Sequence, residues 1–351
     1  MNNHKNSGLV VIALSVVLMC LLSTSCQKTE DKTLVIATYG GAWEQALKSS
    51  VFKAFEDSTG IKIVTAGHTS DYAKLKAMVE SNNVEWDVVD AEGDLHLRAA
   101  RAGLLEPINY TVVDSIPLIH EAVDPFGTGI VIWSTNIAYS DKVFPSGTPH
   151  PTNWAEFWDV KTFPGKRGLR KDPYSTLEFA LLADGVRPEK LYPLDIERAL
   201  LSLDRIKGET IWWETGDQPP QWLVSGEVSV SSAYNGRIWS AKISDQQPVS
   251  VEWGQGMMDI ERWIVPKGCK KKDLAMKFIA FASKVLPQQN LTKYISYGPV
   301  NQQAMTNIDP KMLPDLPTAP ANFHKQFFVN VEWWAANKDR VLEKWNSWIL
   351  K

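Results

Sequence analysis

The chain from residue 33 onward alternates between short apolar strands and segments of helical periodicity. Thr33–Thr38 has the sequence TLVIAT and is followed by Gly40-Gly41, which is typical of a strand that ends in a turn. Trp43–Asp57 places apolar residues at helical spacing, and Ile61–Val64 predicts the next strand. Strands that alternate with helices indicate a mostly parallel sheet with helices on both faces, so we expect an α/β fold.

The same alternation continues through the rest of the chain. Further strands are expected at 86–90, 130–133, 137–139, 228–232, 249–253 and 263–265, and further helices at 72–80, 94–102, 154–158, 177–182, 196–206 and 275–283. The tail has several prolines between residues 310 and 320 and is then helical and rich in Trp. A length of 351 residues allows two domains. No linker is visible, but two lobes crossed by more than one strand would leave none.

The first residues have the pattern of an export signal. Leu9–Leu22 is an apolar run that is too short for a membrane span and suited to a signal peptide. Small residues and then Cys26 follow, which resembles a bacterial lipoprotein signal. We therefore expect a signal peptide over 1–25, a lipid on Cys26 and a tether over 26–32. Cleavage near Ser25 with a free thiol, or a retained anchor, are the alternatives. In either of the first two cases the protein is periplasmic or extracytoplasmic, and with the lipid it is held to a membrane.

Several classes of chemistry lack support in the sequence. The net charge of -3 offers no basic surplus for nucleic acid. The six His residues show no ligand spacing and no CxxC motif is present, so we expect no metal site. Phosphate-binding glycine motifs and a GxSxG elbow are also absent, so we expect no cofactor and no enzyme. A catalytic triad is spatial, however, and an exported α/β enzyme stays an alternative.

Aromatic and acidic side chains follow the predicted strands at their carboxyl ends, where ligands bind in open α/β sheets. The set comprises Tyr39, Trp43, Asp90, Glu92, Asp94, Asp172, Tyr234, Asp259, Glu261 and Tyr297. An aromatic face attracts an ammonium by roughly 0.5–2 kcal/mol. A nearby carboxylate contributes about 4 kcal/mol at an effective dielectric constant near 20, before desolvation. The combination favours an organic cation. For each acid alone, a helix cap or another structural role is the alternative, above all for Asp94, then for Asp90 and Asp172.

Five short motifs resemble a known family in their order and spacing. They are AFEDSTGIKI at 54–63, WDVV at 86–89, AYNG at 233–236, AMKFIAF at 275–281 and YGPVN at 297–301. They resemble the periplasmic solute-binding proteins of ABC importers, in the branch of the spermidine/putrescine-binding proteins. The resemblance implies a type II clamshell with crossing hinge strands. It places 33–136 and 261–305 in lobe 1, and 137–260 and 306–351 in lobe 2. It also implies a monomer that delivers its ligand to permease subunits.

The resemblance also implies a set of ligand-binding residues. Tyr39, Tyr234 and Tyr297 correspond to aromatic walls, and Thr215 to a small hydroxyl residue. Glu261 corresponds to the principal carboxylate that holds an amine, with Asp259 two residues before it. The complete expected set is Tyr39, Gly40, Trp43, Glu92, Asp172, Thr215, Tyr234, Asn235, Asp259, Glu261 and Tyr297.

The chain departs from the family pattern in ways that concern the ligand. Ala91-Glu92-Gly93 stands where the polyamine binders have Ser-x-Tyr, and Ser175 replaces a second carboxylate. Three arginines lie next to expected site positions, namely Arg170, Arg237 and Arg262. An arginine in the cleft favours a ligand with a carboxylate. The acids, the aromatic residues and the resemblance favour a polyamine such as putrescine or spermidine, and the arginines keep an amino-acid-like or other small polar solute as the alternative. A surface interaction protein that uses the Trp-rich tail is a further alternative.

Overall fold

A computed structural model describes residues 32–68, 71–306 and 308–351. The expected signal peptide over 1–25, Cys26 and all of the expected tether except Lys32 lie outside the described residues. None of the helices in the described ranges has the length and apolar character that crossing a membrane requires. From Thr33 onward, the main strands form one sheet in the order β2-β1-β3-β10-β6-β9-β7-β8.

The first lobe, as we name it, is built on three parallel strands. β1 (Thr33–Thr38) lies between β2 (Lys62–Gly67) and β3 (Val88–Ala91), and its bounds are those predicted. The helices of this lobe are α2 (Gly41–Leu47), α3 (Lys53–Thr59), α4 (Tyr72–Glu80), α5 (Leu95–Arg101), α11 (Lys272–Ala282) and α12 (Val285–Thr292). A π-helical turn, Lys48–Phe52, joins α2 to α3, so the helix predicted over Trp43–Asp57 is one continuous segment.

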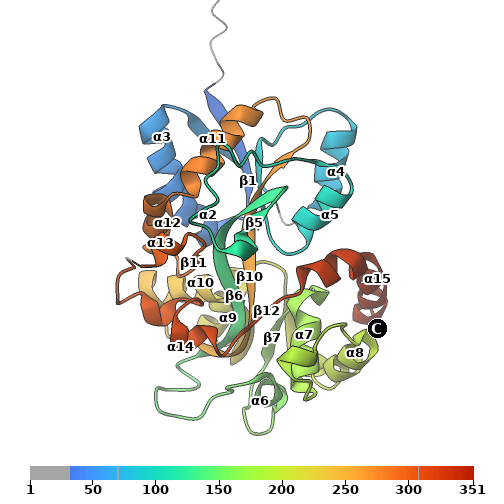
Figure 1. Ribbon diagram of the computed structural model, residues 1–351. Coiled ribbons are helices and arrows are strands. Elements are labelled where there is room, and N and C mark those ends of the chain that lie inside the picture. The colour runs from blue at the N-terminus through green and yellow to red at the C-terminus, as the bar shows by residue number, and fades with distance from the viewer. Residues whose placement is uncertain (1–31, 69–70, 307) are drawn as a thin grey trace, which may run out of the picture. The chain divides into compact units, whose positions relative to one another are not determined.

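The second lobe, as we name it, repeats this plan. β7 (Arg167–Arg170) pairs in parallel with β8 (Thr210–Trp213) and with β9 (Val230–Tyr234). Its helices are α6 (Trp154–Trp158), α7 (Pro173–Ala183), α8 (Ile196–Asp204), α9 (Gln218–Ser225), α10 (Asn235–Trp239) and the C-terminal α15 (Val331–Ile349). α15 lies beside α7 and α8 (Figure 1).

Two long strands connect the lobes. β6 (Gly127–Ser140) and β10 (Val249–Pro266) run antiparallel and side by side from one lobe into the other (Figure 1). β10 pairs with β3 of the first lobe, and β6 pairs with β9 of the second. The sheet is therefore mixed, and the expectation of a mostly parallel sheet is wrong. Short elements complete the chain: β4 (Leu105–Glu106), β5 (Val123–Asp124), β11 (Gly298–Pro299), α13 (Gln302–Met305), α14 (Pro320–Phe323) and β12 (Phe327–Phe328).

The predictions of two separate strands within β6, and of two within β10, are also wrong. In β10 the register shifts between Glu252 and Met257, and Gln255 in between has a φ of 58°. The GQG sequence there interrupts the alternation of side chains, which hides the continuity of the strand.

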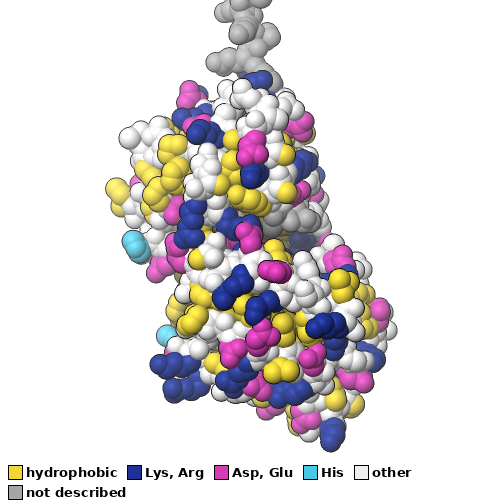
Figure 2. Space-filling model, turned by 90° about the vertical axis from the view of Figure 1, so that its right-hand side faces the viewer, with side chains coloured by type: hydrophobic (Ala, Val, Ile, Leu, Met, Phe, Trp, Pro, Cys, Tyr) yellow, Lys and Arg dark blue, Asp and Glu magenta, His cyan; other side chains and the backbone are white. Residues whose placement is uncertain are grey.

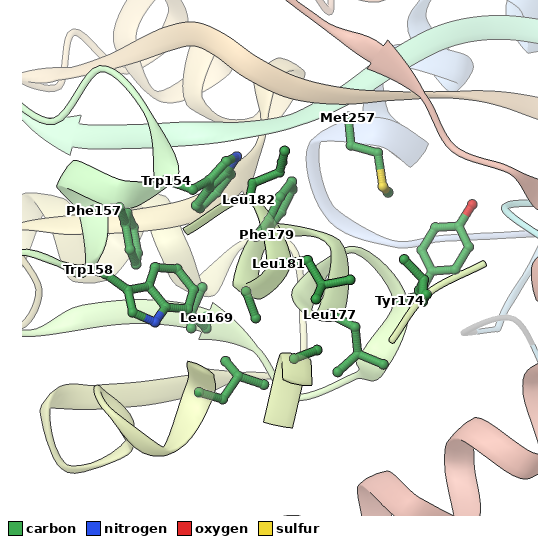
Figure 3. Close-up of a cluster of buried hydrophobic side chains, with 14 of the residues drawn as sticks. Trp154, Phe157, Trp158, Leu169, Tyr174, Leu177, Phe179, Leu181, Leu182 and Met257 are labelled. Atoms are coloured by element: carbon green, nitrogen blue, oxygen red, sulfur yellow. The ribbon is translucent and has the colours of Figure 1, made fainter. Parts of the chain in front are cut away.

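Each lobe has its own apolar core. In the second lobe Trp154 stacks on Phe179 at 3.7 Å between ring centroids, within the cluster shown in Figure 3. α15 adds Trp334, Trp345 and Trp348 to this cluster, so its tryptophans are packed against the lobe. Burial of such a side chain stabilises the fold by about 1.5–3 kcal/mol. The lobe boundaries given by the sequence stay a prediction.

Candidate functional site

A cavity of about 290 Å³ lies between the two lobes, and we call it the cleft. Its lining contains eight of the expected ligand residues: Tyr39, Gly40, Trp43, Glu92, Thr215, Tyr234, Glu261 and Tyr297. The lobes touch each other across it. Arg237 Nη2 of α10 donates to the carbonyl oxygen of Gly40 at 2.7 Å, and Arg170 of β7 pairs with Glu92 at 2.7 Å. The cleft is therefore in a closed arrangement.

Three expected ligand residues lie outside this lining, and each has a structural role. Asp172 is the N-cap of α7 and accepts the backbone N–H of Tyr174 at 2.8 Å. Asp259 accepts the Tyr174 hydroxyl at 2.6 Å and the backbone N–H of Gly93 at 3.1 Å, which ties the lobes together. Asn235 accepts the backbone N–H of Ser134 and donates to the carbonyl oxygen of Ser296. Their partners are protein groups, so they are not free for a ligand.

Asp94, for which a helix cap was the alternative, does precede α5. Its side chain, however, makes no capping hydrogen bond. It forms ion pairs instead, with Arg98 at 3.8 Å and with Lys338 at 3.6 Å.

Aromatic rings form much of the cleft wall. Tyr39 follows β1 and lies 4.6 Å from the ring of His68, which follows β2. Trp43 of α2 contacts Tyr297 at 5.4 Å. Tyr234, at the end of β9, packs edge-on against Trp133 of β6 at 5.1 Å. Because rings from both lobes and from a crossing strand meet here, closing the lobes surrounds a ligand with flat apolar faces.

Two acids lie side by side at the base of the cleft. Asp90 lies in β3, one residue before its end, and its Oδ2 accepts the Thr38 hydroxyl and the Trp43 indole N–H, both at 2.6 Å. Glu261 of β10 lies next to Asp90, because β10 pairs with β3 at this point. Burial raises the pKa of both carboxyls, and the neighbouring negative charge of Asp90 adds to the rise for Glu261. Burial also raises the pKa of the nearby Asp259 to about 6.

Two arginines bring positive charge to the same cleft. Arg170 lies 5.8 Å from the Trp213 ring and 5.7 Å from the Tyr234 ring, and pairs with Glu92. Arg237 donates through Nη1 to Asp217 at 3.0 Å. The cleft therefore offers groups that can bind a cation and groups that can bind a carboxylate.

Several polar atoms of the lining are buried and have no hydrogen-bond partner within the described ranges. They are Glu261 Oε1, Trp133 Nε1, Arg237 Nε and both ring nitrogens of His68. Leaving such an atom unpaired costs about 1–3 kcal/mol. A protein retains such a cost where a ligand or a proton supplies the missing partner. The set includes an acceptor, two donors and an imidazole, whose pKa is lowered by burial.

Sequence reasoning missed His68, Trp133, Glu214 and Asp217 as lining residues, and treated Arg170 and Arg237 only as neighbours. His68 follows the carboxyl end of β2 as Tyr39 follows that of β1, so the rule for strand ends could have found it. Trp133 lies within β6 and carries no such signal.

Residues 50–318 match the model of the family described as bacterial extracellular solute-binding protein. The gamma-aminobutyric acid-binding protein of Pseudomonas aeruginosa is 37% identical over 337 residues, which cover 94% of this chain and 95% of that protein. A solved structure, that of the PBP AgtB from A. tumefaciens R10 in complex with agropinic acid, matches this chain with a TM-score of 0.84. The two sequences are 38% identical, and the match covers 91% of this chain and 99% of AgtB.

The spermidine/putrescine-binding periplasmic protein 1 of Haemophilus influenzae is 23% identical over 290 residues, or 78% of each chain. The expected α/β fold of a periplasmic binding protein is thus confirmed. The spermidine/putrescine branch is the more distant relative.

Proposed function

Because the chain belongs to the family of bacterial extracellular solute-binding proteins, we propose that its cleft binds a small solute carrying both an ammonium and a carboxylate. Solute-binding proteins of this kind serve ABC importers and are not enzymes. γ-Aminobutyric acid, named for one relative, is the chemical model for this ligand.

The charge pattern of the cleft carries the proposal. Four acids line it, and three of them pair with a basic side chain: Glu92 with Arg170, Glu214 with Lys171 and Asp217 with Arg237. Glu261 forms no ion pair with any described residue, and its Oε1 accepts no hydrogen bond. A ligand with one ammonium therefore finds one free acid. Each further ammonium of a polyamine would have to break an existing ion pair, so the alternative ligand class is favoured over the polyamine.

The unpartnered donors supply the other half of the recognition. Arg237 Nε and Trp133 Nε1 are buried, line the cleft and lack acceptors in the part of the chain that the structure describes. A carboxylate accepts hydrogen bonds from both kinds of donor, and a charge-assisted bond to an arginine is among the stronger ones.

The groups that would hold the ligand come from both lobes and from the crossing strands, so a bound ligand stabilises the closed arrangement. Glu261 and Trp133 lie on the crossing strands, Tyr39 in the first lobe and Arg237 in the second. A ligand shifts the equilibrium toward the closed state only through contacts that the open state lacks. A solute held by groups of both lobes meets this condition.

We also propose that the mature protein is anchored by a lipid on Cys26. The apolar run and the small residues before this cysteine support the anchor. Cys26→Ala should release the protein from membranes. If the variant stays with the membrane fraction, the apolar run itself is the anchor.

A thermal-shift panel tests the ligand class. γ-Aminobutyric acid should raise the melting temperature, whereas putrescine and succinate, each lacking one of the two charges, should raise it much less. A shift with putrescine and none with γ-aminobutyric acid would restore the polyamine as the ligand.

A further inference from the structure

Two acids, Asp90 and Glu261, lie next to each other at the base of the cleft. Asp90 is fully buried and Glu261 is 5% exposed. The pairing of β3 with β10 sets Trp263 opposite Asp90, so Glu261 is two residues away on the neighbouring strand. One oxygen of each, Asp90 Oδ1 and Glu261 Oε1, receives no donor from the described residues. Two neighbouring ionised carboxylates that are buried without a cation repel each other, so such a pair is more stable with a proton on one of the two.

The surroundings assign that proton to Glu261. Asp90 Oδ2 already accepts two short hydrogen bonds, from Thr38 and Trp43, which stabilise its ionised form. Glu261 has no such donors within the described ranges, and it sits beside the charge of Asp90. Burial and this neighbour hold the pKa of Glu261 well above its usual value.

Other charged groups around the pair come from several elements. Glu92 after β3 and Asp259 on β10 add negative charge and raise the pKa of Glu261 further. His68 after β2 faces Asp90, and its own pKa is lowered by burial. Arg170 and Arg237 line the same cleft but are paired with Glu92 and Asp217. The remaining positive charge must therefore come from a proton or from a ligand.

We propose that Asp90 and Glu261 determine specificity by holding one proton in the empty cleft and exchanging it for the ammonium group of the ligand. The ammonium donates to the ionised Glu261, and the displaced proton goes to solvent. The acid pair together with the ammonium then has the same net charge as the acid pair with its proton. Glu261 contacts the ligand, whereas Asp90, which does not line the cleft, is a positioning residue. The inference rests on the proposed function, because it needs a ligand with an ammonium.

The exchange explains how a buried cleft selects a cation. A ligand with a neutral hydroxyl in place of the ammonium brings no positive charge to offset the two carboxylates. Such a ligand would have to bind while Glu261 keeps its proton. Proton release also makes the affinity for an ammonium ligand rise with pH. The rise is up to about tenfold per pH unit while Glu261 is protonated in the empty protein.

Isothermal titration calorimetry measures the exchange directly. The full mature protein is titrated with γ-aminobutyric acid at neutral pH in phosphate and in Tris, whose ionisation enthalpies differ. The dependence of the binding heat on the buffer gives the number of protons released. We expect close to one proton per ligand for the wild type and close to zero for Glu261→Gln. Asp90→Asn should also lower the number, because Glu261 then ionises more easily.

Glu178→Gln is the matched control, since Glu178 is another buried acid, located in the core of the second lobe. Its buffer dependence should equal that of the wild type. Binding heat that does not depend on the buffer, or a full proton release that survives in Glu261→Gln, would overturn the exchange.

A second measurement keeps the two proposals apart. Infrared difference spectra of the ligand-free wild type and Glu261→Gln at neutral pH should show a protonated carboxyl band in the wild type alone. If γ-aminobutyric acid gives no heat, the proposed ligand class fails. The exchange is then judged by this band, and its absence overturns it.

Discussion

Two cavities lie on either side of the Glu92–Arg170 ion pair, and they differ in whether their charges have partners. Both linings include these two residues. The second, which we call the side cavity, has a volume of about 240 Å³ and is also lined by Asp94, Arg98, Asp172 and Lys338. Among the described residues, Glu261 of the cleft forms no ion pair, and Arg237 Nε and Trp133 Nε1 have no acceptor. In the side cavity, every charged side chain forms an ion pair.

Two charged residues of α15, Lys338 and Asp339, form ion pairs with residues around the side cavity. Lys338 lies 3.6 Å from Asp94 of the first lobe and 3.8 Å from Asp172 of the second. Arg98 of α5 pairs with Asp339 of α15 at 2.8 Å. Figure 2 views the side on which α5 and α15 lie, where basic and acidic side chains are interspersed. A charged lining therefore does not by itself mark a ligand site, and the side cavity serves the contact between the lobes.

The largest effect is expected for an arginine of the cleft. Arg237→Met removes a donor for the ligand carboxylate, so the affinity for γ-aminobutyric acid should fall about 100-fold, or about 2.7 kcal/mol. Arg98→Met, which removes an arginine of the side cavity, should change the affinity less than about fivefold. Calorimetry on both variants checks the difference. Equal losses would remove the distinction between the two cavities.

A smaller loss is expected where the second lobe closes on the first. Gly41 has a φ of 69°, and a Cβ there would lie 2.1 Å from Asp217 Oδ2. Gly41→Ala should therefore hinder closure of the lobes and lower the affinity about tenfold. The positive φ also strains the backbone of the alanine. The neighbouring Gly40→Ala is the matched control, since nothing lies within 4 Å of its Cβ position. A normal affinity for Gly41→Ala would show that the lobes need not approach this closely.

A still smaller change is expected for the ion pairs of α15. Lys338→Met leaves the cleft intact but weakens the contact between the lobes. The affinity should fall about threefold, without any change in the order of ligand preference, as for a partly exposed ion pair. High salt should reduce the difference from the wild type. A changed ligand preference, measured on the same thermal-shift panel, would mean that the side cavity takes part in recognition.

The smallest effect on binding is expected for Glu178, although its effect on stability depends on pH. It accepts the Tyr192 hydroxyl and the Trp334 indole N–H, both at 2.6 Å, and burial raises its pKa to about 7. A raised pKa stabilises the folded state below the unfolded pKa, and this stability is lost as the pH rises through about 7. The loss amounts to about 3 kcal/mol at most, given about 1.36 kcal/mol per pKa unit.

Glu178→Gln retains an acceptor and carries no charge. Denaturant unfolding should show that the wild type becomes less stable as the pH rises from about 4.5 to just above 7, and that the variant does so less. Parallel curves for the two proteins would contradict this.

The elements that the sequence predicts well are those with strong local signals. β1 is bounded by polar and glycine residues, and α6 begins after Asn153, whose side chain caps it. β6 and β10 were each expected as two strands, because their continuity depends on pairing with each other over most of their lengths. Pairing between segments more than a hundred residues apart leaves no local pattern.

The candidate site shows the same division. Tyr39 and Glu261 could be predicted from strand ends and from the family resemblance, and both line the cleft. Asp172 fits the same pattern but caps α7 and faces Lys338, which lies far along the chain. Residue type and spacing predict which groups gather near the strand ends. They do not predict which of these groups another side chain neutralises.

A crystal structure of the protein with γ-aminobutyric acid tests the ligand assignment most directly. The ammonium should lie within hydrogen-bond distance of Glu261, and the carboxylate should accept from Arg237 Nε and Trp133 Nε1. A solute bound in the reverse direction, or seated in the side cavity with Glu261 untouched, would contradict the assignment.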